Sequence, residues 1–307
     1  MTTYKFIQCD VFTDEIFAGN PLAVFHDEVA NQSLDDATMQ KIAREMNLSE
    51  TVFVLPPSDP TKALKRLRIF TPGMELPMAG HPVVGTWNML VRLGVVAAPA
   101  SGTGRVTIQQ EIKLGILPVE IDFVDHQPVK VTMTQGTPSV GEPLDEVALC
   151  ARALGLAEDE IGGWGLPIVL ASTGVPYQII PVRDKAALSR IKVNYQILAE
   201  VIQKVDDHAV YAVTRETHSP NAFVSARMFA GESIGVGEDP ATGSAAGPCA
   251  AALVHYGLAP SQFIIEQGVD MGRPSYIEAD VKGALGNVQV VRIGGNAVIV
   301  LTGELQV

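Results

Sequence analysis

Cysteine is scarce in this sequence of 307 residues. The three cysteines, Cys9, Cys150 and Cys249, are far apart, and none forms a C-x-x-C pair or has a histidine nearby in the sequence. An odd number of scattered cysteines supports neither a disulfide framework nor a structural zinc site. We therefore expect the fold to depend on its apolar core alone.

Positive charge is also scarce, since 22 Lys and Arg stand against 34 Asp and Glu, for a formal net charge of −12. No run of basic residues stands out, which argues against nucleic-acid binding, because that function depends on Lys and Arg neutralising phosphates. The protein as a whole repels anions, so an acidic ligand would need a locally positive site.

Long apolar runs are missing as well. No stretch approaches the eighteen or more apolar residues of a membrane helix, and the early Asp10 does not fit an ordinary signal peptide. The sequence therefore predicts no membrane association and a cytoplasmic enzyme or binding protein. It also contains no Walker A loop, no G-x-S-x-G elbow, no H-E-x-x-H and no dinucleotide G-x-G-x-x-G after a strand, so we predict neither a cofactor nor a metal.

What the sequence does contain is apolar residues, at 47% of the chain, and a length that usually divides into two domains of about 150 residues. A helix is predicted from Ala37 to Met46, with acids before it and Asn47 as its stop, and strands are predicted at 51–55 and 63–70. Glu50 therefore stands where a helix has ended and a strand begins.

Two nearly uncharged helices are predicted, one starting near Pro82 and stopping at Gly94, the other running to Gly257. The segments before them resemble each other: Arg68-Ile-Phe through Ala79-Gly-His-Pro-Val-Val-Gly85, and Arg227-Met-Phe through Ala241-Thr-Gly-Ser-Ala-Ala-Gly247. This internal repeat predicts an α+β fold of two pseudo-symmetric domains. Each domain is expected to be a mostly antiparallel sheet or barrel wrapped around a central buried helix.

The starts of these two helices are candidate anion sites, because unpaired N–H groups and a partial positive charge gather there. The helix starts are Gly80-His81-Pro82 and Thr242-Gly243-Ser244, and their glycines would let a ligand approach the backbone closely, although glycines also ease tight turns. A neutral His81 could donate a hydrogen bond or relay a proton, or simply cap its own turn.

Four further candidates also have ordinary alternatives. Asp239 could be an N-cap, Ser244 an unremarkable first-turn residue, and Glu50 a solvated surface carboxylate. Arg273 could pair with a substrate carboxylate or be a solvated loop residue.

Six short motifs, taken in order, resemble the phenazine-biosynthesis PhzF-like isomerase family, which shares its fold with diaminopimelate epimerase. They cover nearly the whole chain and are Asp10-Val-Phe-Thr, Phe17-Ala-Gly-Asn-Pro-Leu-Ala-Val24, Leu48-Ser-Glu-Thr-Val-Phe53, Glu75-Leu-Pro-Met-Ala-Gly-His-Pro82, Glu238-Asp-Pro-Ala-Thr-Gly-Ser244, and Gln267-Gly with Met271-Gly-Arg-Pro-Ser275. The resemblance implies an active site in a cleft between the two domains, and a homodimer. We place the first domain at residues 1–125, closed by a strand from about 295–307, and the second at 126–294.

The resemblance also assigns roles to individual residues. Glu50 falls on the family's acid/base, with His81, Asp239 and Ser244 as the other catalytic candidates. The expected substrate-binding residues are Asn20, Gly80, Thr242, Gly243 and Arg273.

The related epimerases use a cysteine at each helix start, and here the comparable positions are Ala79 and Pro240. Two-thiol racemisation is therefore disfavoured. A single carboxylate can instead move a proton between two carbons of a small carboxylated metabolite, which predicts a cofactor-independent isomerase with Glu50 as general acid/base. Two alternatives stay open: an epimerase or racemase of an amino or hydroxy acid, with Glu50 and Asp239 as opposed bases, and a non-catalytic metabolite-binding protein.

Overall fold

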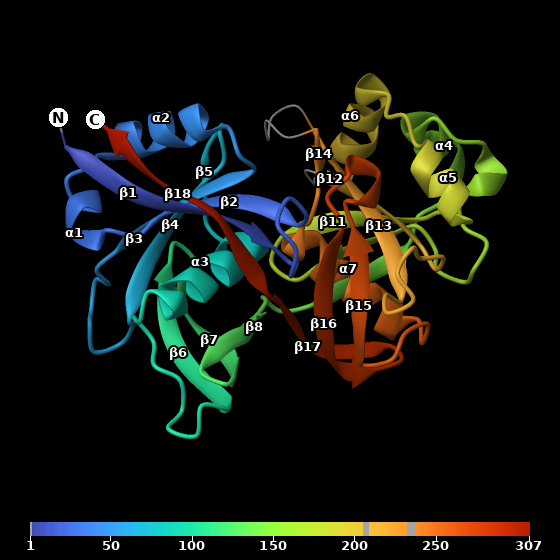
Figure 1. Cartoon of the computed structure of the whole chain (residues 1–307). Helices are drawn as coiled ribbons and strands as arrows, with labels where there is room; N and C mark the ends of the chain where they lie inside the picture. Colours follow the sequence, from blue (N-terminus) through green and yellow to red (C-terminus); the bar gives the residue numbers. More distant parts are fainter. Residues whose placement is uncertain (1, 205–208, 232–236) are drawn as a thin grey trace. The chain divides into compact units, whose positions relative to one another are not determined.

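The computed structural model describes residues 2–204, 209–231 and 237–307, which divide into two compact units (Figure 1). The first unit comprises the described residues up to Thr134 together with Gly294–Val307, and the second comprises Gln135–Ile293. The boundary expected from the sequence falls after residue 125. The units differ from it because the strand Gln127–Thr134 pairs with the strand before it and stays with the first unit.

The first unit is a sheet of strands that come mainly from the N-terminal part of the chain, with one helix inside the sheet and two outside it. Its elements are β1 (Thr3–Val11), β2 (Asn20–Phe25), α1 (Glu28–Asn31), α2 (Asp36–Met46), β3 (Glu50–Leu55), β4 (Lys65–Phe70), β5 (Glu75–Leu76), α3 (Gly80–Arg92), β6 (Gly104–Ile112), β7 (Gly115–Val124), β8 (Gln127–Thr134) and β18 (Ala297–Gln306). β18, from the far end of the chain, pairs antiparallel with β1, as the sequence-based closing strand requires.

The sheet of the first unit runs β18-β1-β2-β3-β4-β6-β7-β8, and β5 pairs with the end of β4. All pairings are antiparallel except β2 with β3 and β4 with β6. In the parallel β2–β3 pair, Leu22 lies opposite Glu50, which fixes the first residue of β3 beside β2. The mostly antiparallel sheet is thus confirmed for this half.

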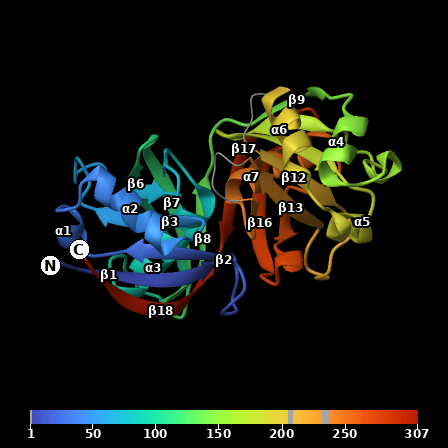
Figure 2. The same cartoon turned by 90° about the horizontal axis from the view of Figure 1, so that it is seen from above.

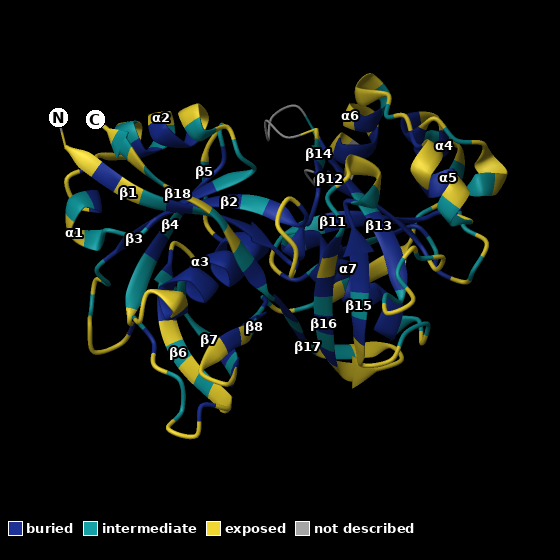
Figure 3. Ribbon diagram, in the orientation of Figure 1, coloured by how far each residue is buried: buried dark blue, intermediate teal, exposed yellow. Residues whose placement is uncertain are grey.

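α3 lies inside this sheet, and each of its residues except the last is buried, as the dark blue helix in Figure 3 shows. It contacts β1, β2, β3, β8 and β18. At Gly85 a Cβ atom would come within 2.6 Å of the Val11 side chain, so the close approach of helix and strand requires glycine there. On the opposite face, α2 buries Met39 and Ile42 against phenylalanines of the sheet such as Phe53.

The second unit repeats this plan with a larger set of outer helices. Its elements are β9 (Ser139–Pro143), α4 (Val147–Leu154), the 3₁₀ turn η1 (Glu158–Glu160), β10 (Val169–Ser172), β11 (Pro176–Pro181), α5 (Lys185–Arg190), α6 (Tyr195–Lys204), β12 (Ala209–Thr214), β13 (Val224–Ala230), β14 (Glu238–Asp239), α7 (Gly243–His255), β15 (Gln262–Gln267), the 3₁₀ turn η3 (Val269–Met271), β16 (Ser275–Ala284) and β17 (Asn287–Gly295). Its sheet runs β9-β10-β11-β12-β13-β15-β16, with β14 paired to the end of β13.

The pairing pattern of the second unit matches that of the first. β11 with β12 and β13 with β15 are the two parallel pairs, just as β2 with β3 and β4 with β6 are. α7 takes the place of α3 and contacts β9, β10, β11 and β16; Figure 2 shows it from above, next to β16. The internal repeat predicted from the sequence is therefore a repeat of topology, and the predicted fold class is confirmed.

Two polar contacts recur at equivalent positions. Arg68 makes a two-pronged ion pair with Glu75 through Nε and Nη2 at 2.8 and 3.0 Å, and Arg227 does the same with Glu238 at 2.7 and 2.9 Å. These pairs fix the two-residue strands β5 and β14 against β4 and β13.

The register of the repeat differs by one residue from the sequence-based match. The residue before α3 is Ala79 and the residue before α7 is Thr242, so Ala79 is equivalent to Thr242 and not to Ala241. Each helix has 13 residues and is followed directly by its C-cap residue and then by a glycine. It follows that His81 and Ser244 occupy the same position, the second residue of the helix.

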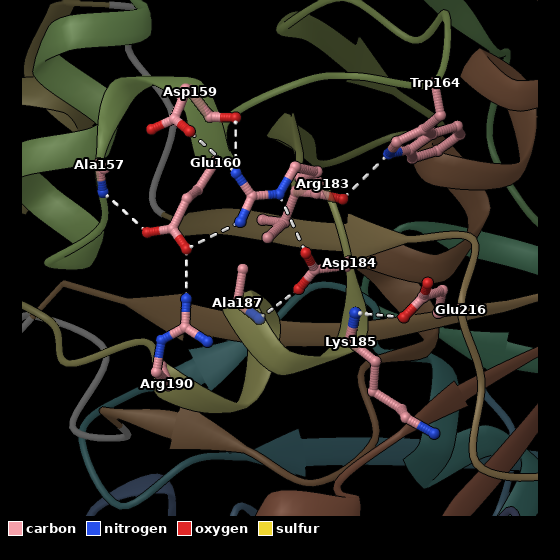
Figure 4. Close-up of polar contacts among 11 residues, drawn as sticks. Ala157, Asp159, Glu160, Trp164, Arg183, Asp184, Lys185, Ala187, Arg190 and Glu216 are labelled. Carbon is pink, nitrogen blue, oxygen red and sulfur yellow. Dashed lines mark hydrogen bonds and ion pairs between the residues drawn. The ribbon is translucent and has the colours of Figure 1, made fainter.

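The outer helices of the second unit are joined at the surface by an ion-pair network (Figure 4). Arg183 donates to Asp159 and to Asp184, both at 3.0 Å, and Glu160 contacts both Arg183 and Arg190. Exposed ion pairs typically contribute about 0.2–1 kcal/mol each. We therefore infer that this network attaches η1 to α5. No helix among the described residues combines the length and the apolar character needed to cross a membrane.

Candidate active site

Glu50 is placed by the turn between α2 and β3. α2 ends at Met46, and its C-cap residue Asn47 adopts the left-handed conformation with φ 50°, which reverses the chain toward the strand. Glu50 then begins β3, and its side chain is 14% exposed. The carboxylate is therefore only partly exposed to solvent.

His81, the second residue of α3, brings a second polar group to this carboxylate. Its buried ring has Nε2 3.2 Å from Glu50 Oε2 and Nδ1 3.2 Å from Asn20 Nδ2. Asn20 begins β2, is fully buried, and follows Gly19, whose φ of 65° is accessible to glycine. Three residues far apart in the sequence, Asn20, Glu50 and His81, are thus brought together in the first unit.

Burial lowers the pKa of His81 from 6.5 to about 3, because charging the ring inside the protein would cost its hydration. The ring is therefore neutral around pH 7. A neutral imidazole has one donor and one acceptor nitrogen, which suits a group between an amide and a carboxylate.

This lowered pKa predicts a loss of stability in acid. The unfolded chain binds a proton at His81 near its ordinary pKa, and the folded chain does so only near pH 3, so stability is lost as the pH falls through that window. Between about pH 7 and about pH 5, the free energy of unfolding of the wild-type protein should fall by about 2 kcal/mol more than that of His81→Gln. Urea unfolding at both pH values measures the difference.

A matched control uses His218→Gln, since the His218 side chain is exposed in the folded protein. Its stability should follow the wild-type pH dependence. Parallel curves for wild type and His81→Gln would contradict the prediction.

In the second unit, Asp239 and Thr242 form a buried turn before α7. The Thr242 hydroxyl donates to Asp239 Oδ2 at 2.6 Å. The buried amide of Gln267 supports this turn on both sides: Nε2 donates to Asp239 O at 2.7 Å and to Thr242 Oγ1 at 3.0 Å, while Oε1 accepts from Thr242 N and from the Tyr211 hydroxyl. The amide uses its full hydrogen-bonding capacity here.

Removing this amide should destabilise the second unit. Gln267→Met keeps the length of the side chain but leaves Thr242 N–H, the Tyr211 hydroxyl and Asp239 C=O without their partner, so we expect a loss of about 3 kcal/mol in the free energy of unfolding. Gln110→Met is the matched control in the first unit, because the buried Gln110 accepts from Trp87 Nε1 at 2.7 Å and its Nε2 has no hydrogen-bond partner within the described ranges. It should lose about 1 kcal/mol. Equal losses would argue against the supporting role of Gln267.

Ser244 lies on the first turn of α7, and its hydroxyl is 2.8 Å from that of Tyr177 at the start of β11. The carbonyl of Gly243 accepts from the buried Gln135 amide at 2.8 Å, and Gln135 in turn accepts from Thr173. The start of α7 is therefore fixed from two sides by side chains of its own unit.

Arg273 lies in the loop between η3 and β16 and is half-buried. The hydroxyl of Ser275 donates to the carbonyls of both Arg273 and Pro240, at 3.0 Å each, so the backbone of Arg273 is next to the turn that contains Asp239. Gly268, with φ 78°, permits this approach, because a Cβ atom there would lie 2.4 Å from the Arg273 carbonyl.

The starts of the two central helices have no side-chain cap. Ala79 cannot accept a hydrogen bond through its side chain, and the Thr242 hydroxyl is directed to Asp239. Gly80 and Gly243 are the first residues of α3 and α7, so the backbone N–H groups of these first turns carry no side chain over them. Such helix starts favour anions.

The structure thus places the predicted residues in two sets. Asn20, Glu50, Gly80 and His81 lie together in the first unit, and Asp239, Thr242, Gly243 and Ser244 lie together in the second, with the backbone of Arg273 nearby. Sequence reasoning did not identify Gln267, Tyr211 and Tyr177 as site residues. Gln267 could have been predicted, because it is the first residue of one of the six motifs. Neither tyrosine lies in a motif, so the sequence does not indicate their roles.

The cysteines lie away from both sets. Cys9 is in β1, Cys150 in α4, and Cys249 is the seventh residue of α7, and all three are buried. Burial raises the pKa of Cys9 and of Cys249, which disfavours the thiolate form. Among residues 2–204, 209–231 and 237–307, no three His, Cys, Asp or Glu residues are placed to hold a metal ion.

Comparison with known proteins gives one consistent family. Residues 9–303 match the family model described as phenazine biosynthesis-like protein. An uncharacterised isomerase from Mesorhizobium japonicum is 41% identical over 99% of both chains, and trans-2,3-dihydro-3-hydroxyanthranilate isomerase from Pseudomonas aeruginosa is 36% identical over 95% of this chain and 96% of its own. The crystal structure of a PhzF-family protein from Bacillus anthracis superposes with a TM-score of 0.88 at 27% identity, covering 100% of both chains.

Proposed function

Because the chain belongs to the phenazine biosynthesis-like protein family and is an isomerase, we propose that it moves a proton within a small carboxylated metabolite, without a cofactor, and that Glu50 is the general acid/base. The observation that carries the proposal is the contact of 3.2 Å between Glu50 Oε2 and His81 Nε2. A partly exposed carboxylate beside a buried, neutral imidazole can reach a substrate and has a polar neighbour within 3.2 Å.

The surroundings of Glu50 support transfer by one base. A carboxylate that takes a proton from one carbon can return it to another carbon of the same conjugated substrate, which shifts a double bond. Racemisation by two thiols would need cysteines at the helix starts, and Cys9, Cys150 and Cys249 are buried elsewhere. The remaining epimerase alternative needs Asp239 as a second base, and the Oδ2 atom of Asp239 already accepts from Thr242.

The second set of residues suits binding of the substrate carboxylate. The uncapped start of α7, with Gly243 and the Ser244 hydroxyl, offers N–H and O–H donors, and so does the uncapped start of α3 at Gly80. These donors supply the local attraction for an anion that a protein of net charge −12 otherwise lacks. That both sets act on one substrate stays a prediction.

The test is turnover in D₂O followed by proton and deuterium NMR. The first substrate to try is trans-2,3-dihydro-3-hydroxyanthranilate, named by the relative from Pseudomonas aeruginosa, followed by other small unsaturated carboxylic acids. We expect a product with a displaced double bond and deuterium on one new carbon. Deuterium at an inverted stereocentre with no double-bond shift would support the epimerase alternative. Binding in a thermal-shift screen with no exchange for any acid that binds would support a non-catalytic binding protein.

The homodimer and the cytoplasmic location expected from the sequence stay predictions. Sedimentation equilibrium of the full-length chain measures the first directly, with twice the mass of 32.7 kDa as the expected result. A single species at the monomer mass across the concentration range would contradict it.

A further inference from the structure

Asn20, expected from the sequence to bind substrate, makes a contact that suggests another role. Its amide nitrogen Nδ2 lies 3.2 Å from Nδ1 of His81, and the opposite ring nitrogen of His81 faces Glu50. We propose that Asn20 is a positioning residue that fixes the neutral ring of His81 in the tautomer with its proton on Nε2. The tautomer rests on the contacts and the burial of the ring, whereas its catalytic consequence rests on the proposed function of Glu50.

The donor and acceptor inventory of the three groups permits one arrangement. An amide nitrogen can only donate, so Nδ1 of His81 must be the acceptor. A neutral imidazole then carries its single proton on Nε2, where it faces Glu50 Oε2 at 3.2 Å. An ionised carboxylate can only accept, so each ring nitrogen meets a complementary partner.

The other tautomer would create two mismatches. A proton on Nδ1 would oppose the N–H of Asn20, and the Nε2 lone pair would oppose the Glu50 carboxylate. In a buried site each such mismatch is expensive, because no water is present to relieve it. The ring is also held neutral by its burial, so it cannot avoid the choice by carrying both protons.

The position of Asn20 is fixed well enough to select one tautomer of His81. It is fully buried, its backbone pairs with Val11 across the β1–β2 ladder, and Pro21 restricts its conformation from the other side. Gly19 turns the chain into the strand at a positive φ where a Cβ atom would lie 2.4 Å from the Val11 carbonyl. The amide therefore reaches His81 from a fixed position on the sheet.

The consequence for catalysis is a directional hydrogen bond. With its proton on Nε2, His81 presents a donor 3.2 Å from Glu50 Oε2. A small rotation of the carboxylate would complete the hydrogen bond and orient the carboxylate while it acts as a base. With the proton on Nδ1, the ring could not donate to the carboxylate. Asn20 would then act on the reaction through His81 without touching the substrate.

The experiment determines the tautomer of His81 in the full-length protein, labelled with ¹⁵N-histidine, by long-range proton–nitrogen correlation spectra. The His81 signals are assigned by their disappearance in His81→Gln. We expect the Nε2–H form in the wild-type protein at neutral pH. The Nδ1–H form, or rapid exchange between the two, would overturn the proposal.

Asn20→Asp provides the decisive variant, because it keeps the size of the side chain and replaces the donor by an acceptor. We expect the ring to place a proton on Nδ1, as the other tautomer or as imidazolium. Asn88→Asp is the control: it adds a buried acid to the same helix, where Asn88 contacts Asn296 and Arg92 and not the ring. It should leave the spectrum of His81 unchanged. An unchanged Nε2–H form in Asn20→Asp would also overturn the proposal.

These spectra are recorded without substrate, so they test the tautomer even if the isomerase proposal fails. Where turnover is found, Asn20→Asp should lower it by about 10²-fold, the lower range for a general acid–base contribution, and Asn88→Asp should not. A tautomer change with unchanged turnover would separate the two proposals: the positioning role in catalysis would fail, and the hydrogen-bond assignment would remain.

Discussion

Replacing Glu50 by Gln is expected to lower the turnover number by about 10²–10⁴-fold, the range that a general acid or base contributes. The amide keeps the size of the side chain and can still lie beside His81, but it cannot take or return a proton. Deuterium incorporation from solvent should stop together with product formation, because both require the same proton transfer. The measurement is the initial rate in D₂O with the first substrate that shows turnover.

Glu75→Gln is the matched control for this variant. Its side chain is 19% exposed, close to the 14% of Glu50, and it also begins a strand of the first unit, but its partners are Arg68 and Lys113. It should keep wild-type turnover and lose some stability through the weakened ion pair. Undiminished proton exchange in Glu50→Gln would end the assignment of Glu50 as the base. A comparable rate loss in both variants would point to a general effect of removing a carboxylate.

Glu266→Ala is expected to lower the free energy of unfolding by about 4 kcal/mol. The Glu266 side chain is fully buried and accepts from the backbone N–H groups of His218 and Ser219, at 2.8 and 2.7 Å, and from the hydroxyl of Ser225. Its removal leaves the buried Ser225 hydroxyl and two partly buried backbone N–H groups without their partner, and a buried donor left unpaired costs about 1–3 kcal/mol. Denaturant unfolding of the full-length protein measures the loss.

The internal repeat supplies the control. Glu111 occupies the equivalent position on β6 and accepts from the backbone and the hydroxyl of Ser58, both at 2.6 Å, but its side chain is 18% exposed. Water can replace it there, so Glu111→Ala should cost only about 1 kcal/mol. Equal losses would mean that burial does not decide the strength of these contacts.

The parts of the fold that the sequence predicts well are those with a strong local pattern. α3 and α7 were predicted because they are apolar on all sides and followed by glycine, and both are the central buried helices. β15 was not predicted, because Glu266 and Gln267 lie at its buried end and interrupt the apolar pattern. β5 and β14 are two residues long and are held by Arg68 and Arg227, so no local pattern exists for them.

The candidate site was also predicted only in part: the sequence indicates some of its residues but not the contacts between them. Motifs identified Glu50 and His81, but the contact between these two residues, 31 positions apart, is a property of the sheet that only the fold provides. The contact between Asn20 and His81 was not predicted, and the substrate-binding role that the family resemblance implies for Asn20 stays a prediction. The sequence leaves the register of the repeat ambiguous by one residue, because runs of Ala and Gly match each other equally well at either offset, and the structure shows that Ala79 is equivalent to Thr242.

The equivalence of His81 and Ser244 has a consequence for how such an enzyme can change. Each unit has its own arginine–glutamate pair and its own carboxylate, Glu111 or Glu266, that accepts hydrogen bonds from a loop between two strands. Each half therefore maintains its scaffold with side chains other than those of the candidate site. The second residue of each central helix is then free to differ, an imidazole in one half and a hydroxyl in the other. Because each half maintains its own scaffold, one half can acquire a new reactive group at this position without a loss of stability in the other half.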